Sequence, residues 1–291
     1  FCIKKDVQFL TGCCIIKIIA NIERVSAMIL NEQQLTAYFE RIGLRCEDYK
    51  DRPLDSCFLG ELMTAHARTM PFENLDLING TLLSLSEDLY DKIVLRHRGG
   101  NCFELNGLCG VFLRSLGFGV SDYFSRFFRD AGDQIPMRRH RLLKVEASDG
   151  PFLWDIGIGQ RSPNRPLRIV EGLSQKDGDQ IYRFQKEPFY GWVLYEYHDD
   201  QWLRILSFTE EPQVDVDFVT ACVWCELHPS SPFNKRYMIA MKTPDGRKTM
   251  DGNIYKEFYG NELAVLKELT EEEIPQYLLA QFGLTIPSEK N

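Results

Sequence analysis

The stretch at 98–106, with the sequence RGGNCFELN, constrains the fold more than any other part of the chain. Its two glycines allow a tight turn. Asn101 is a strong helix N-cap, and Glu104 stands three residues later, as in a capping box. Apolar residues follow at helical spacing, and Gly117 can end the helix: Leu105, Leu108, Cys109, Phe112, Leu113 and Leu116. The pattern predicts a core-facing helix that begins at Cys102.

Cys102 allows two interpretations at this position. A helix N-terminus stabilises a thiolate through the helix dipole and free backbone amides, and such amides can also hold an oxyanion. Cysteine is also a common small apolar core residue, which would leave Cys102 without a chemical role. Because Cys102 follows both a helix cap and a glycine turn, the sequence supports the reactive and the apolar-core interpretations about equally.

Composition excludes several classes of protein. The 291 residues carry a net charge of -8, which leaves no basic surplus for a nucleic-acid partner. Nine cysteines, an odd number, favour free thiols in a reducing cytoplasm over a disulfide framework. The apolar run at 13–19 contains Lys17 and is too short to span a bilayer, so no membrane partner is expected. We interpret 1–27 as an extraneous or disordered segment, with Met28 as the native start.

The apolar periodicity changes along the chain. Helical stripes at 31–43, 59–67 and 83–95 predict a mostly helical unit that ends with the Cys102 helix. Short β-prone runs then predict a barrel or sandwich over about 120–210, with a hairpin turn at 148–150. The segment 215–235 reads as a connecting helix and loop. Strands follow between 237 and 257, and Thr270 with Glu273 caps a last helix that ends at Gly283.

An acid within an apolar strand marks a second place of interest. Asp155 lies in the run WDIGIG, where an unpaired buried carboxylate would be costly. His140 begins the preceding strand, and hairpin geometry sets it opposite about position 158, so contact with Asp155 needs a diagonal pair or a bulge. Cys102, His140 and Asp155 together have the residue types of a nucleophile, a base and an orienting acid. The sequence does not show that the three meet.

Two further patterns are too incomplete to indicate a binding site. Cys222 and Cys225 form a single CxxC without a second pair, so we expect no metal site. The glycines at 157 and 159 lack the G-x-G-x-x-G spacing of a dinucleotide loop.

The motifs nevertheless resemble one family in order and spacing. The run 98–106 resembles the RGGxCxExN signature of the arylamine N-acetyltransferases, and PFENL at 71–75 is similar to the motif upstream of it. HRLL at 140–143, DIGIG at 155–159 and HPSSPF at 228–233 resemble later family segments. The likeness runs from about residue 30 to 285.

This resemblance implies an α+β fold in three parts. A helical domain would cover 28–118, a β-barrel domain 119–222, and a connecting segment with an α/β lid domain 223–291. The catalytic core would have papain-like and transglutaminase-like geometry. Within it, Cys102 would be the nucleophile, His140 its base and Asp155 the orienting acid.

The resemblance also implies the substrates. An acetyl group would pass from acetyl-coenzyme A through a cysteine thioester to the nitrogen of arylamines, arylhydroxylamines or hydrazines by a ping-pong mechanism, as in cytoplasmic xenobiotic metabolism without a metal. We assign Trp224, Ser230 and Arg138 to the coenzyme, although the two adjacent arginines would equally suit a solvated strand end. Phe72, Arg139 and Ile158 are assigned to the acceptor; Ile158 replaces an aromatic residue common in the family.

Two other functions remain open from the sequence. A cysteine hydrolase or transglutaminase-like amidase would use the same three residues without coenzyme A. A non-catalytic binding protein on the same fold would have no need to keep all three. The sequence leaves the preferred amine, the acyl group and the oligomeric state undetermined.

Overall fold

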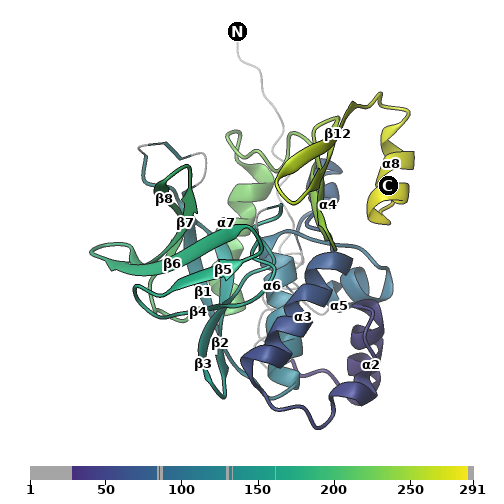
Figure 1. Ribbon diagram of the computed structural model, residues 1–291. Coiled ribbons are helices and arrows are strands. Elements are labelled where there is room, and N and C mark those ends of the chain that lie inside the picture. Colours follow the sequence, from purple (N-terminus) through teal and green to yellow (C-terminus); the bar gives the residue numbers. More distant parts are fainter. Residues whose placement is uncertain are drawn as a thin grey trace, which may run out of the picture.

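The computed structural model describes residues 28–83, 85, 88–128, 131–132, 134–160 and 162–287, and the expected segment 1–27 lies outside them. The architecture is α+β: helices gather at one side, an eight-stranded sheet lies beside them, and a four-stranded sheet with a terminal helix covers a third side (Figure 1). The helical part contains α2 (Glu32–Arg41), η1 (Cys46–Tyr49), α3 (Ser56–Thr69), α4 (Leu75–Ile78), α5 (Asp88–Tyr90), η2 (Asp91–Leu95) and α6 (Cys102–Ser115).

Local sequence signals account for the two best-defined helices. Asn101 forms the capping box expected at α6, Asn31 forms one with Gln34 at the start of α2, and the apolar stripe of α6 packs into the core. The helix expected over 83–95 is shorter. It begins only at Asp88 and continues into the wide π-helical turn η2, a geometry that a period of 3.6 residues does not encode.

The eight-stranded sheet is antiparallel and nearly closed. Its order is β4-β3-β2-β1-β8-β7-β6-β5. A parallel bridge from Glu171 to Phe184 places the segment between the two edge strands, β4 and β5, against β6, and the sheet curves around an apolar interior. Its strands are β1 (Gly119–Phe127), β2 (Arg138–Ala147), β3 (Gly150–Trp154), β4 (Leu167–Arg168), β5 (Ser174–Asp177), β6 (Gln180–Glu187), β7 (Gly191–His198) and β8 (Gln201–Phe208). The predicted barrel region is therefore present.

The second sheet is a meander of β9 (Met238–Thr243), β10 (Gly246–Asp251), β11 (Ile254–Tyr259) and β12 (Glu262–Glu268), with α8 (Ile274–Phe282) packed against it. The strand β12 was not expected. Its side chains are nearly all exposed, including Leu263 and Leu266, so it lacks the alternation that marks a half-buried strand. Glu273 accepts a hydrogen bond from the Thr270 backbone, but Thr270 does not cap the last helix as predicted: α8 starts at Ile274, with Glu273 at the N-cap and no side-chain cap bond.

Two connections hold the second sheet against the catalytic region. The Phe72 backbone pairs with Ala240 of β9 on one side and bridges to Gly100 on the other. Asn74 donates hydrogen bonds to the Phe233 and Arg236 carbonyls and accepts one from the Met238 backbone. The helix α7 (Asp215–Leu227) links the two sheets, and the expected domain boundary at 222 falls inside it. No helix in the described part of the chain is long and apolar enough to cross a membrane.

Candidate active site

Cys102 occupies the first turn of α6, as the capping pattern predicts. The Asn101 side chain accepts hydrogen bonds from the backbone amides of Phe103 and Glu104, at 2.9 and 3.3 Å. Two of the amides expected for an oxyanion are thus already occupied. In the described part of the chain the backbone N–H of Cys102 itself has no acceptor, so it is the amide left to face a substrate oxygen.

His140 and Asp155 meet, but not through the predicted bulge or diagonal pair. The strand expected to continue to Ile158 ends at Trp154, whose partner across the hairpin is Leu143. Asp155 then leaves the sheet, and its Oδ2 accepts a hydrogen bond of 2.6 Å from His140 Nε2. This pairing leaves Nδ1 as the ring nitrogen available to the Cys102 sulfur.

The environment of His140 favours its charged form. Burial opposes an imidazolium, but the negative charges of Asp155 and Cys102, with a hydrogen bond to each, outweigh burial and raise the pKa of His140 to about 10. The ring therefore holds its proton at neutral pH, beside the Cys102 sulfur. The sequence predicted a pairing of His140 with Cys102, and the raised pKa of His140 shows that the ring is protonated in that pairing.

Asn106 is a positioning residue to which sequence reasoning assigned no role. Its Nδ2 donates to Asp155 Oδ1 at 2.9 Å and to the Arg141 carbonyl at 2.6 Å, and its Oδ1 accepts from the Ile156 backbone. It thereby fixes the acid, the strand of the base and the loop between them. The available signal was its spacing: Asn106 lies one helical turn after Cys102, on the same face of α6.

Gly157 brings the Asp155 loop close to the nucleophile. A Cβ atom at this position would lie 2.6 Å from Cys102 Cα and 2.8 Å from Asn106 Nδ2, closer than any side chain permits. The Gly157 backbone also donates to Asp155 Oδ1 at 2.9 Å. The first glycine of DIGIG thus serves close packing against Cys102.

A buried charge cluster supports the same helix turn from the other side. We call it the scaffold cluster; its members are Glu73, Asp76, Lys92, Arg98 and Glu104. Lys92 Nζ lies 2.6 Å from Asp76 and 2.7 Å from Glu104, and Arg98 lies 2.7 Å from Glu73. The second Glu104 oxygen accepts from the Asn101 backbone, so the cluster is tied to the cap of α6. The PFENL and RGGNCFEL motifs therefore meet in one ion network.

The three residues assigned to the coenzyme, Trp224, Ser230 and Arg138, lie in different surroundings. The ring of Trp224 is covered by the guanidinium of Arg139, at 5.2 Å, and the same guanidinium lies 5.5 Å from the ring of Phe233. Ser230 is exposed in the turn after α7. Arg138 is half-buried over Phe124 and lies 3.7 Å from Glu211, so part of its charge is compensated.

The acceptor-side residues are divided between two surroundings. Phe72 is half-buried beside Gly159, and Ile158 packs against the barrel core. Arg139, assigned with them, stacks instead on Trp224, a residue assigned to the coenzyme. Phe127, which sequence reasoning did not single out, places its ring 6.3 Å from that of His140.

Comparison with known proteins identifies the class of the chain. A family model described as N-acetyltransferase matches residues 57–291. The described residues contain no group of three or more histidine, cysteine or acidic side chains placed to hold a metal ion. The match covers most of the chain and includes all three candidate catalytic residues.

Individual relatives show which kind of N-acetyltransferase the chain resembles. The chain is 38% identical to an arylamine N-acetyltransferase of Mycobacterium tuberculosis over 75% of this chain and 77% of the relative. It is 32% identical to a Salmonella typhimurium arylamine N-acetyltransferase / N-hydroxyarylamine O-acetyltransferase over 88% and 91%. The solved Salmonella typhimurium enzyme superposes with a TM-score of 0.82 at 28% identity, covering 90% of this chain and 95% of that one. The chain belongs to the arylamine N-acetyltransferase family.

Proposed function

We propose that the chain transfers an acetyl group from acetyl-coenzyme A, through a thioester on Cys102, to the nitrogen of an arylamine, arylhydroxylamine or hydrazine. The observation that carries this proposal is the His140–Asp155 pair beside Cys102 at the capped start of α6. Family membership supports it, as does the structure of the Mycobacterium marinum arylamine N-acetyltransferase in complex with CoA, which matches with a TM-score of 0.77 at 30% identity over 86% of this chain and 92% of that one.

The first half-reaction loads the enzyme. The Cys102 thiolate attacks the thioester carbonyl, and the Cys102 backbone N–H accommodates the developing oxyanion. When the tetrahedral intermediate collapses, the bond to the coenzyme sulfur breaks and His140 donates its proton to the leaving thiolate. The products are coenzyme A with a free thiol and an acetyl-cysteine beside a neutral imidazole.

The second half-reaction returns the enzyme to its starting state. An arylamine is a weak base, so it is neutral and nucleophilic at pH 7. Its nitrogen attacks the acetyl carbon, His140 takes the proton from that nitrogen, and Cys102 leaves as a thiolate. Asp155 holds the imidazole ring in place through its hydrogen bond to Nε2.

In this proposal, one group of residues contacts the coenzyme and another contacts the acceptor. Trp224, Ser230 and Arg138 would contact the coenzyme, and Phe72 and Ile158 the aromatic acceptor. Arg139 bridges the two groups because it is held on the Trp224 ring. The described cysteines are free, which favours a reducing compartment such as the cytoplasm. The division at 118 and 222 into three domains is part of the same proposal.

Initial-rate kinetics and mass spectrometry test the proposal together. Varying acetyl-coenzyme A at several fixed arylamine concentrations should give parallel double-reciprocal lines, the pattern of a covalent intermediate. Enzyme mixed with acetyl-coenzyme A alone should gain one acetyl group, lose it on addition of amine, and gain none at this site in Cys102→Ala. Intersecting lines without acetylated enzyme would overturn the thioester mechanism, and rapid release of acetate without amine would indicate a hydrolase instead.

A further inference from the structure

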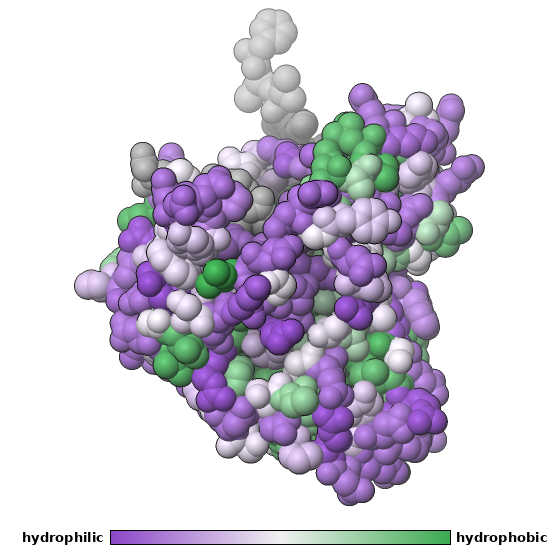
Figure 2. Space-filling view, viewed as in Figure 1, coloured by the Kyte–Doolittle hydropathy of each residue, from purple (hydrophilic) through white to green (hydrophobic). Residues whose placement is uncertain are grey.

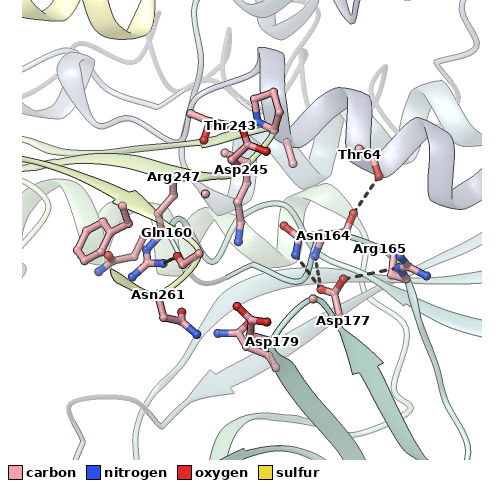
Figure 3. Close-up of a pocket in the computed structure, with 18 of the residues that line it drawn as sticks. Thr64, Gln160, Asn164, Arg165, Asp177, Asp179, Thr243, Asp245, Arg247 and Asn261 are labelled. Atoms are coloured by element: carbon pink, nitrogen blue, oxygen red, sulfur yellow. Dashed lines mark hydrogen bonds and ion pairs between the residues drawn. The ribbon is translucent and has the colours of Figure 1, made fainter. Parts of the chain in front are cut away.

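A polar cleft separate from the candidate active site lies where the three parts of the molecule meet. Its volume is about 690 Å³, and it is lined by α3, the loop after Gly159, the turn between β5 and β6, and the hairpin of β9 and β10 (Figure 3). Neither Cys102, His140 nor Asp155 is among its lining residues. Hydrophilic side chains gather on the surface in this central region (Figure 2).

Lys242 on β9 lies in this cleft without a direct partner. In the described part of the chain, its Nζ has neither a hydrogen bond nor an ion pair. Lys92 provides the contrast, because its buried ammonium lies 2.6 and 2.7 Å from two carboxylates. A half-buried amine that faces a cavity but has no acceptor is poorly stabilised as an ammonium.

The charged groups around Lys242 do not remove this cost. Asp177 is already occupied by the Asn164 backbone at 2.6 Å and by Arg165 at 3.6 Å. Burial lowers the pKa of Lys242 to about 8; Asp177 and Glu196 act against this shift, and the positive charge of Arg247 adds to it. The remaining charged or titratable lining groups are Arg68 from α3, Asp179 from the β5–β6 turn, Tyr197 and His198 from β7, and Asp245 from the β9–β10 hairpin.

We propose that Lys242 is a second acyl-accepting nucleophile, which takes an acyl group from a thioester as a stable amide. The neutral amine attacks the thioester carbonyl, the carbon–nitrogen bond forms and the carbon–sulfur bond breaks. The thiol leaves with the proton released from nitrogen, so no oxidant or further reactant is needed. The cleft has the volume of a small-molecule site and admits the acyl end of such a donor.

Two donors share this chemistry. One is an acyl-coenzyme A that enters the cleft from solution. The other is the acetyl group on Cys102, a source that rests on the proposed function. The cleft adjoins the Asp155 loop: Gln160 lines it, and a Cβ on Gly159 would contact both Phe72 and Ala240, the residue two positions before Lys242 on the same face of β9.

Site-resolved acetylation rates test the proposal. Folded Cys102→Ala enzyme is incubated with acetyl-coenzyme A between pH 6.5 and 9.5, treated with hydroxylamine to remove thioesters, and analysed by peptide mass spectrometry. At pH 7.5 a lowered pKa exposes more neutral amine, partly offset by lower nucleophilicity, so Lys242 should react about tenfold faster than an ordinary exposed lysine. Exposed Lys50 and carboxylate-paired Lys92 are internal controls in the same digest.

The same acetylation rates are then measured in the wild-type enzyme, to identify the acyl donor. A faster rate at Lys242 than in Cys102→Ala identifies the Cys102 thioester as donor, and equal rates identify the donor in solution. Lys242→Arg, which keeps the charge, should abolish the modified peptide with an unchanged circular dichroism spectrum. If Lys242 in the Cys102→Ala enzyme reacts no faster than Lys50, the proposal is wrong, whatever the kinetics at Cys102 show.

Discussion

Two buried groups of charges lie on opposite sides of the first turn of α6, and they differ in what their protons can do. In the scaffold cluster, burial disfavours the Lys92 ammonium, but Glu104, Glu73 and Asp76 outweigh it and raise the pKa of Lys92. Its charge is therefore fixed at every physiological pH. In the triad, the pKa of His140 is raised to about 10, so the imidazolium can still release its proton during the reaction.

The ordinary pKa of each group accounts for this difference, because an imidazole starts from about 6.5 and a lysine ammonium from about 10.4. The partners differ as well: Lys92 contacts two carboxylates directly, whereas His140 contacts one carboxylate and the Cys102 sulfur. A cluster saturated with fixed charges holds the backbone in position. A smaller cluster with one exchangeable member can pass a proton. We therefore expect changes in the triad to affect rate and changes in the scaffold cluster to affect stability.

The largest effect is expected from Asp155→Asn. An amide does not stabilise the imidazolium, and it competes for the wrong imidazole tautomer, so acetyl transfer should fall by about 1,000-fold or more. Steady-state rates with a saturating arylamine measure this loss, and exposed Asp199→Asn is the matched control. A wild-type rate in folded Asp155→Asn enzyme would exclude Asp155 from the triad.

Lys92→Met tests the other side of the comparison. Removing the cation leaves Asp76 and Glu104 buried without it, which should lower the free energy of unfolding by about 3–5 kcal/mol. Below the melting transition, the rate per folded molecule should fall less than about tenfold, because the triad is untouched. Urea unfolding measures the stability.

The control for this experiment is Lys50→Met, at an exposed position, which should change stability by less than about 0.5 kcal/mol. Equal losses of stability in the two variants would contradict the structural role of the scaffold cluster.

The smallest effect concerns the proton on His140. Because its pKa is raised on folding, the contribution of His140 to stability is fully present below about pH 6.5 and is lost as the pH rises through 10. Ring NMR signals of His140 should therefore titrate near pH 10. In Cys102→Ala the titration should move to lower pH and stay above the ordinary histidine value, because Asp155 remains. A midpoint near 6.5 in the wild-type enzyme would contradict the ion pair.

Comparison of the sequence with the structure shows that local signals were dependable. The start of α6 at Cys102 follows from Asn101 and Glu104, because a capping box involves residues only three positions apart. The cost of a lone buried acid predicted that Asp155 needs a partner, and the motifs of 98–106 and 71–75 identified the family confirmed by its relatives. How β3 ends at Trp154, and how Asn106 joins the acid to the strand of the base, depends on contacts between distant segments.

Two lysines show most clearly what the sequence alone determined and what only the tertiary structure decided. In the sequence, Lys92 and Lys242 are equivalent charged residues in mixed surroundings. Folding places Lys92 against carboxylates from α4 and α6, and it leaves Lys242 in a cleft where the nearby carboxylate of Asp177 is engaged by other donors. Whether a buried amine is a fixed charge or a nucleophile depends on which distant acids reach it, and only the packed chain sets those distances.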